Sequence, residues 1–253
     1  MARAAVSRRL TWRLARVVEL TDETATVRCL GLAVPDWPGH LPGQHVDVRL
    51  TAPDGYQAQR SYSIASPPSE DGRLELAVER LPDGEVSSYL TGELRADDQL
   101  ELRGPIGGYF VWEPRMGGPL LLVAGGSGIV PLIAMLRHRA AVQSQVPTRL
   151  LYSSRSLPDV IYREELDRLA AQANGPEVHH TLTRDHPPDW PGYTRRIDAA
   201  MLSEVAWPKT QGPLAYVCGP TQLVESVASA LLELGYPADR IRTERFGPTG
   251  GSS

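Results

Sequence analysis

Cysteine is scarce in this chain: Cys29 and Cys218 are the two among 253 residues. Two thiolates are too few for an iron–sulfur cluster, which is usually held by four. A disulfide between them is possible in principle, but one pair does not make the framework of a secreted domain. The cysteine content therefore favours a cytoplasmic protein that holds no cluster of its own.

Long apolar runs and an excess of positive charge are also missing. No stretch approaches the roughly 20 apolar residues of a membrane span, and residues 1–20 lack the apolar segment of a secretory signal. The 26 basic residues are outnumbered by 30 acidic ones, for a net charge of −4, which argues against a nucleic-acid-binding surface. The basic cluster in 3–16 is explained by a solvated face; a docking patch for an acidic electron-transfer partner is the alternative.

The first half of the chain has the pattern of short antiparallel strands. Leu74, Leu76 and Val78 occupy alternate positions, as they do in a strand with one buried face. Turn-forming Pro and Gly residues separate this segment from other candidates at 12–20, 25–32, 45–50 and 100–103. Many short strands with regular turns favour an antiparallel β-barrel, expected here over residues 1–115.

The character changes after a Pro/Gly-rich stretch at 114–119, the candidate linker. Residues 120–124 are a continuous apolar run, typical of a strand buried on both faces. Strands and helices then alternate, which predicts an α/β domain with a parallel sheet over residues 116–253. The expected strands are 148–153, 177–182, 214–218 and 241–246, and the expected helices are 131–141, 161–173 and 221–234, the last capped by Gly235.

Five short motifs follow one another in a specific order. They are Arg60-Ser61-Tyr62-Ser63, Gly84-Glu85-Val86-Ser87-Ser88, Gly125-Gly126-Ser127-Gly128, Cys218-Gly219-Pro220 and Glu244-Arg245-Phe246-Gly247. Each is weak alone, but the ordered set resembles the flavin-dependent ferredoxin–NADP reductase superfamily from about Trp12 to Gly247. The resemblance implies that the barrel binds a flavin and the α/β domain a nicotinamide nucleotide.

The first motif supplies the groups that a flavin requires. An arginine offers a fixed guanidinium fork for phosphate, and Tyr62 projects to the same face of a strand as Arg60. The resemblance assigns Arg60 to the phosphate, Tyr62 to the ring and Ser63 to the N5 edge as a catalytic residue, with Ser61 also in the binding segment. Taken alone, the tetrapeptide would be an ordinary strand.

The second motif has the features of a pyrophosphate clasp, which favours FAD over FMN. Backbone N–H groups and two serine hydroxyls could hold the anion at the start of a short helix. The alternative is a plain turn with Ser87 as the helix N-cap. The cofactor-binding residues expected in this region are Val78, Arg80, Gly84, Val86, Ser87 and Ser88.

Glycines between a buried strand and a helix suit a nucleotide phosphate, because no Cβ blocks approach of the backbone. The spacing departs from G-x-G-x-x-G and is similar to the superfamily's own loop, which assigns Gly126, Ser127 and Gly128 to the nucleotide. Cys218, Gly219 and Pro220 follow a later strand. The resemblance places Cys218 beside the nicotinamide C4 as a second catalytic residue, with a buried structural cysteine as the alternative. Phe246 either covers the flavin, guides the nicotinamide or lies at the edge of the core.

The residues at the end of the second strand of the α/β domain predict which nucleotide is preferred. An acidic residue there suits NAD, and arginine suits the 2′-phosphate of NADP. This chain has Ser154 and Arg155 at that place, followed by Tyr162. These three residues are expected to bind the 2′-phosphate, so NADPH is favoured and NADH remains possible.

The predicted activity is transfer of hydride from NADPH to bound FAD, with electrons passed to a separate ferredoxin or oxygenase component. A reductase acting on free flavin and an electron-transfer subunit of a larger complex are the alternatives. The three histidines His179, His180 and His186 match no metal-binding template, so no metal site is expected. A monomer is assumed.

Overall fold

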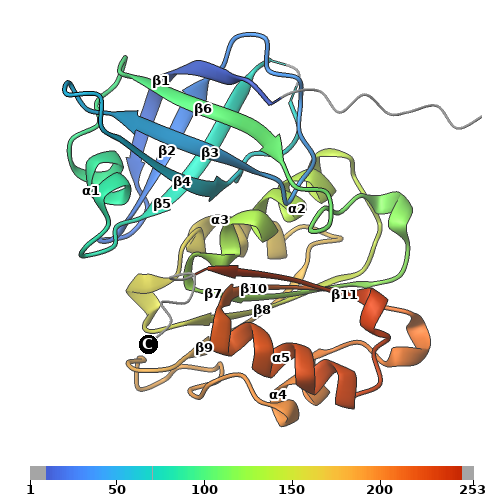
Figure 1. Ribbon diagram of the computed structural model, residues 1–253. Coiled ribbons are helices and arrows are strands. Elements are labelled where there is room, and N and C mark those ends of the chain that lie inside the picture. The colour runs from blue at the N-terminus through green and yellow to red at the C-terminus, as the bar shows by residue number, and fades with distance from the viewer. Residues whose placement is uncertain (1–9, 70, 247–253) are drawn as a thin grey trace, which may run out of the picture.

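A computed structural model describes residues 10–69 and 71–246 and shows two sheets, one above the other in Figure 1. The first has six strands in the order β4-β3-β6-β1-β2-β5, and every described pairing within it is antiparallel. Its strands are β1 (Trp12–Asp22), β2 (Val27–Ala33), β3 (His45–Thr51), β4 (Gln57–Ser63), β5 (Arg73–Glu79) and β6 (Gln99–Ile106).

This sheet curls into the predicted barrel, with β4 and β5 as its two edges. The edges meet at one end through the bridge between Ile64 and Leu76. The short helix α1 (Glu85–Gly92) contacts both edge strands. Its Val86 and Leu90 side chains are buried in the barrel core. Helix α1 therefore fills the seam that strand pairing leaves unclosed.

The second sheet has five parallel strands in the order β11-β10-β7-β8-β9. They are β7 (Leu120–Gly125), β8 (Thr148–Ser154), β9 (Glu177–Leu182), β10 (Leu214–Pro220) and β11 (Ile241–Phe246). The helices are α2 (Ile129–Ala141), α3 (Arg163–Ala170), α4 (Ala199–Val205) and α5 (Thr221–Glu233), and the 3₁₀ turns are η1 (Pro114–Met116), η2 (Gly126–Gly128), η3 (Leu157–Asp159), η4 (Lys209–Gln211) and η5 (Ala238–Arg240).

Helices cover both faces of the parallel sheet. One core joins the sheet to α2 and α3, and it also includes barrel residues such as Cys29, Ala65 and Ala77. A second core joins the opposite face to α4 and α5. Helices α2 and α3 therefore lie between the sheet and the barrel (Figure 1), and one continuous core links the two halves of the protein.

The two-domain architecture predicted from sequence is confirmed. Helix α4 was not predicted, and α3 begins at Arg163 rather than at residue 161, because Tyr162 has the left-handed φ of 60° and serves as the N-cap. Within the described part of the chain, no helix combines the length and apolar character needed to cross a bilayer.

Candidate functional site

The strand order of the parallel sheet reverses between β7 and β10. From β7 the chain proceeds outward through β8 and β9, and then returns to the other side of β7 for β10 and β11. Open α/β sheets bind ligands at such a switch point, beyond the carboxyl ends of the strands. The glycine loop η2 follows β7 here, and Cys218-Gly219-Pro220 ends β10.

These two motifs pack against each other so closely that side chains are excluded. A Cβ on Gly128 would lie 2.1 Å from the Cys218 carbonyl oxygen, and one on Gly219 would lie 3.1 Å from Gly125. Gly126 differs, because its φ is +54° and a Cβ there would meet no atom within 4 Å. Gly128 is therefore packed against the end of β10, whereas the space around Gly126 is open, which suits an approaching phosphate.

On the barrel, the edge strand β4 presents three of the predicted flavin-binding residues. Arg60 is exposed, and its guanidinium donates to the neighbouring carbonyl of Gln59 at 2.7 Å. Tyr62 is half-buried against the barrel core, and burial raises the pKa of its hydroxyl to about 12. Ser63 is 5% exposed, and its Oγ has no hydrogen-bond partner among the described residues. A buried hydroxyl without a partner is costly, so Ser63 is suited to a polar ligand atom.

Ser61 lies on the opposite face of β4. Its hydroxyl donates to Asp47 Oδ1 at 2.7 Å, and Arg103 donates to the same carboxylate at 2.6 Å. Side chains alternate between the faces of a strand, so the Ser61 hydroxyl lies on the face opposite Arg60 and Tyr62. Ser63, at the end of β4, shares that face, but its hydroxyl has no partner among the described residues, whereas the Ser61 hydroxyl is bound to Asp47. Ser61 could therefore contact a flavin only through its backbone N–H or carbonyl group.

In the predicted pyrophosphate clasp, the serine hydroxyls form hydrogen bonds with the backbone of the preceding turn. Ser87 Oγ accepts from the Leu81 N–H and donates to the Gly84 carbonyl, both at 3.2 Å, and Ser88 Oγ donates to the Leu81 carbonyl at 3.4 Å. Gly84, and not Ser87, is the N-cap of α1. Both serine hydroxyls shape the loop, which leaves backbone N–H groups as the anion donors.

The other residues expected around this loop differ in what they can offer. The side chains of Val78 and Val86 are buried in the barrel core and can contribute only their backbone to a ligand. Arg80 is exposed and lines a hollow of about 370 Å³ together with Arg28, Thr26 and Thr91. No described carboxylate pairs with Arg60 or Arg80, so both guanidinium groups are available to phosphate.

At the carboxyl edge of the parallel sheet, β8 ends at the buried Ser154, and the exposed Arg155 follows it. The Arg155 guanidinium lies 3.8 Å from Asp159, and the Arg155 carbonyl accepts from the N–H of Arg184 at 2.9 Å. Arg184, which the sequence leaves as equally well explained by a solvated loop, is therefore a second exposed arginine whose backbone lies beside that of the first. Adjacent strands in a parallel sheet end at the same edge, and this register is the signal that would have identified it.

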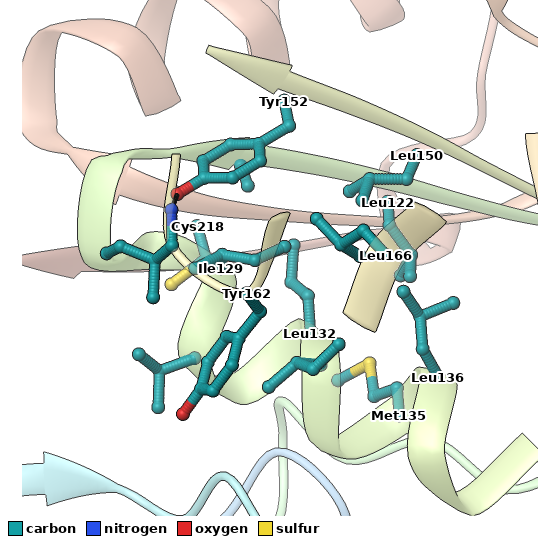
Figure 2. Close-up of a cluster of buried hydrophobic side chains, with 14 of the residues drawn as sticks. Leu122, Ile129, Leu132, Met135, Leu136, Leu150, Tyr152, Tyr162, Leu166 and Cys218 are labelled. Carbon is teal, nitrogen blue, oxygen red and sulfur yellow. Dashed lines mark hydrogen bonds between the residues drawn. The ribbon is translucent and has the colours of Figure 1, made fainter. Parts of the chain in front are cut away.

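The structure contradicts the expectation that Tyr162 binds a nucleotide phosphate. Tyr162 is 3% exposed, and its hydroxyl donates to Glu75 of the barrel at 2.9 Å and accepts from the Cys29 thiol at 3.5 Å. Figure 2 shows its ring extending past Ile129 and Leu132 toward the strands of the barrel. The left-handed φ turns this side chain away from the strand ends, so it joins the two domains instead.

Cys218 is fully buried on the face of the parallel sheet that meets the barrel. Burial and the nearby Glu244 raise the pKa of its thiol, so the thiol is neutral and is not an activated nucleophile. Cys218 is opposite Glu244 in the pairing of β10 with β11. Phe246, two residues further on, packs against the core between the domains.

Glu244 is the functional candidate that sequence analysis missed. Burial raises the pKa of its carboxyl to about 7, so the group gains or loses a proton near neutral pH. Such a pKa is typical of groups at functional sites. Glu244 lies in the recognised motif Glu244-Arg245-Phe246, but its place opposite Cys218 depends on the register of β10 and β11, which the sequence does not show.

Comparison with known proteins agrees with this geometry. Residues 14–111 match the model of the oxidoreductase FAD-binding domain, and residues 122–229 match that of the oxidoreductase NAD-binding domain. An NADH-cytochrome b5 reductase 1 from Aspergillus terreus is 31% identical over 88% of this chain and 77% of its own length. The chain belongs to the ferredoxin–NADP reductase family. It is an oxidoreductase that binds FAD and a nicotinamide nucleotide.

Two further similar proteins illustrate the range of relatives. A glycine betaine monooxygenase reductase subunit from Pseudomonas aeruginosa is 32% identical over 94% of this chain, which spans 66% of that protein's length. The flavohem-like FAD/NAD-binding domain of a nitric oxide dioxygenase from Vibrio cholerae has a TM-score of 0.83 at 26% identity, over 93% of this chain and 99% of that domain.

Proposed function

We propose that this protein oxidises NADPH, collects the electrons on bound FAD and passes them to a separate protein acceptor in the cytoplasm, such as a ferredoxin or an oxygenase component. The observation that carries the proposal is the close packing of the glycine loop against Cys218-Gly219-Pro220 at the switch point, in the face of the sheet that meets the barrel. The resemblance to a monooxygenase reductase subunit favours this class of acceptor.

The residues on the barrel fit the flavin. Ser63 supplies a buried oxygen without a partner for the ring edge, Tyr62 supplies a wall, and Arg60 and Arg80 supply unpaired positive charge for the phosphates. The bound flavin supplies the capacity to accept hydride and release electrons singly. The protein contributes position and electrostatics, and Cys218, near the end of β10, would help to place the nicotinamide against the flavin.

The preference for NADPH rests on charge at one edge of the sheet. Arg155 and Arg184 are both exposed, and the backbone bond between them holds their strand ends together. Two guanidinium groups suit a 2′-phosphate, for which arginine is preferred over an acidic residue. Glu244, beside Cys218, would release or take up the proton that accompanies flavin oxidation and reduction.

Anaerobic titration of the purified protein tests the whole proposal. NADPH should bleach the flavin with a higher kcat/KM than NADH, and the reduced protein should then reduce a ferredoxin or oxygenase component. Arg155→Ala should lower kcat/KM for NADPH by about tenfold, the value of one charge-assisted hydrogen bond, and leave NADH nearly unchanged. Equal use of both nucleotides by the unmodified protein would reject the NADPH preference.

The second candidate, reduction of free flavin as a substrate, is favoured by the exposed β4 edge. It predicts that FAD is lost on gel filtration and that added riboflavin or FMN is turned over. Retention of FAD through gel filtration, with no turnover of added flavin, would exclude this candidate.

A further inference from the structure

Arg137 on α2 uses one guanidinium to join the two domains. Its Nε and Nη2 donate to the two oxygens of Glu165 on α3, both at 2.7 Å. Its Nη1 reaches across to the barrel and donates to Glu75 at 2.8 Å and to the Ala65 carbonyl at 3.0 Å. A planar, forked guanidinium bound on both sides holds its partners in a fixed relative orientation.

The barrel groups that Arg137 holds lie next to the predicted flavin edge. Ala65 follows Ser63 by two residues, and its N–H donates to the Glu75 carbonyl at 2.8 Å. Ile64, between them, forms the bridge that closes the barrel. Arg137 therefore anchors the segment that leads directly out of Ser63.

The other end of α2 starts at the nucleotide loop. The helix begins at Ile129, directly after Gly128, so Arg137 lies about two turns along a single rigid element. The side chain of Arg137 is 16% exposed and those of Glu165 and Glu75 are 21% and 31% exposed, so water screens these bonds only in part.

Tyr162 strengthens the junction from α3. Its hydroxyl donates to the same Glu75 oxygen, its N–H donates to Glu23 of the barrel at 2.7 Å, and the Arg137 guanidinium lies 4.8 Å from the centre of its ring. The Arg137 contacts are therefore part of a network that crosses the interface at several points.

We propose that Arg137 is a positioning residue for flavin reduction. It sets the placement of Ser63 and the flavin edge relative to the glycine loop, and hence the distance across which hydride moves. The inference depends on the FAD- and NAD(P)-dependent activity of the family, and not on the identity of the final acceptor or on the choice between NADPH and NADH.

Stopped-flow reduction of the FAD-loaded protein tests the proposal, with whichever nucleotide reduces the unmodified protein faster. Arg137→Gln should lower the limiting rate of flavin reduction by about tenfold or more, because small misplacements of reacting groups are costly. FAD content and the Kd of the nucleotide should change by less than about twofold, since neither binding pocket loses a group. The long-wavelength charge-transfer absorbance of the nucleotide–flavin complex should weaken, because it reports stacking of the two rings.

Arg149→Gln is the matched control. Arg149 also donates to a carboxylate, Glu177, and to a backbone carbonyl, that of Val205, and its side chain is 22% exposed, but all these partners lie in the α/β domain. In the flavin-free protein, hydrogen exchange over residues 63–66 and 74–77 should accelerate in Arg137→Gln and not in Arg149→Gln.

Glu75→Gln provides a second variant, used for the decision if Arg137→Gln does not fold. It removes the charge on the barrel side and should reproduce a slower reduction with retained FAD. An unchanged limiting rate in a folded variant would overturn the proposal. A loss of FAD or nucleotide affinity that accounts for the whole defect would overturn it as well, because Arg137 would then serve binding or folding.

Discussion

At the scale of single residues, two glycines of one loop have different tasks. Gly128→Ala would place a Cβ 2.1 Å from the Cys218 carbonyl oxygen, so we expect loss of several kcal/mol of unfolding free energy, about 2 kcal/mol or more. Gly126→Ala meets no atom but keeps a left-handed φ, which costs roughly 1–2 kcal/mol. Chemical denaturation measures the difference, and a larger loss for Gly126→Ala would contradict the packing described.

Gly126→Ala should still impair function, because its Cβ occupies the open side of the loop. We expect the KM for the nucleotide to rise by about tenfold while FAD binding stays unchanged, since the flavin lies on the other domain. Steady-state kinetics together with FAD fluorescence distinguish the two effects. An unaltered KM would show that the phosphate does not approach this residue.

Ser63 combines a structural cost with a proposed role. Its buried oxygen has no partner among the described residues, so Ser63→Ala should leave the flavin-free protein as stable as before or more stable, by about 1 kcal/mol. The same change should slow flavin reduction in the loaded protein by at least about tenfold. Thermal unfolding and stopped-flow absorbance give the two readings, and a large destabilisation would show that the oxygen has a partner.

Glu244 makes the stability of the flavin-free protein depend on pH. Burial raises the pKa of its carboxyl to about 7 from the ordinary 4.5, so the folded protein binds a proton that the unfolded chain has lost. The free energy of unfolding should therefore fall as pH rises from about 4.5 to about 7, with the penalty fully present above 7. Glu244→Gln should remove this fall and increase stability at pH 8. Denaturation curves between pH 5 and 8 check both, and identical pH dependence in the two proteins would reject the shifted carboxyl.

At the scale of elements, α1 has the task of closing the barrel seam. Leu90 is fully buried in the barrel core, so Leu90→Ala should cost about 2–5 kcal/mol of unfolding free energy. It should also weaken FAD binding, because the proposed phosphate-binding residues 84–88 form the N-terminus of α1. Leu232→Ala, on an exposed position of α5, is the control and should stay within about 0.5 kcal/mol. If Leu90→Ala left the FAD affinity unchanged, the packing of α1 in the seam would not contribute to the flavin site.

Sequence patterns predicted some helices and strands better than others. The strands β9 and β11 have the expected bounds, although β9 (Glu177–Leu182) and β11 (Ile241–Phe246) are edge strands with mixed polar and apolar residues. Their place in the alternation of strands and helices predicts them better than an apolar run does. Helix α4 has seven residues, too few for a periodic pattern. The alternation that places Tyr62 beside Arg60 also places Ser61 on the other face, but it does not show that Asp47 binds the Ser61 hydroxyl. Tyr162 was assigned from its position after Arg155, and no sequence pattern shows the left-handed φ that directs its side chain to the barrel.

At the scale of the whole molecule, binding and folding are linked. Both proposed ligand sites use backbone at places where elements meet, namely the β4–β5 seam and the β7–β10 switch point. FAD at about 100 times its Kd should stabilise the folded protein by about 2.7 kcal/mol. At roughly 2–4 °C for each kcal/mol in a chain of this size, the rise in Tm should be roughly 5–11 °C. Scanning calorimetry with and without FAD measures the shift, and FMN gives the comparison that tests the need for the adenosine half.

The seam between β4 and β5 also has a consequence inside a living cell. Unpaired strand edges are sites of aggregation and proteolysis when they are uncovered, and the proposed flavin site includes residues of the edge strand β4. In a cell starved of riboflavin, the flavin-free protein should therefore be degraded faster than FAD can bind to it. Its abundance should follow the vitamin supply even when transcription is constant.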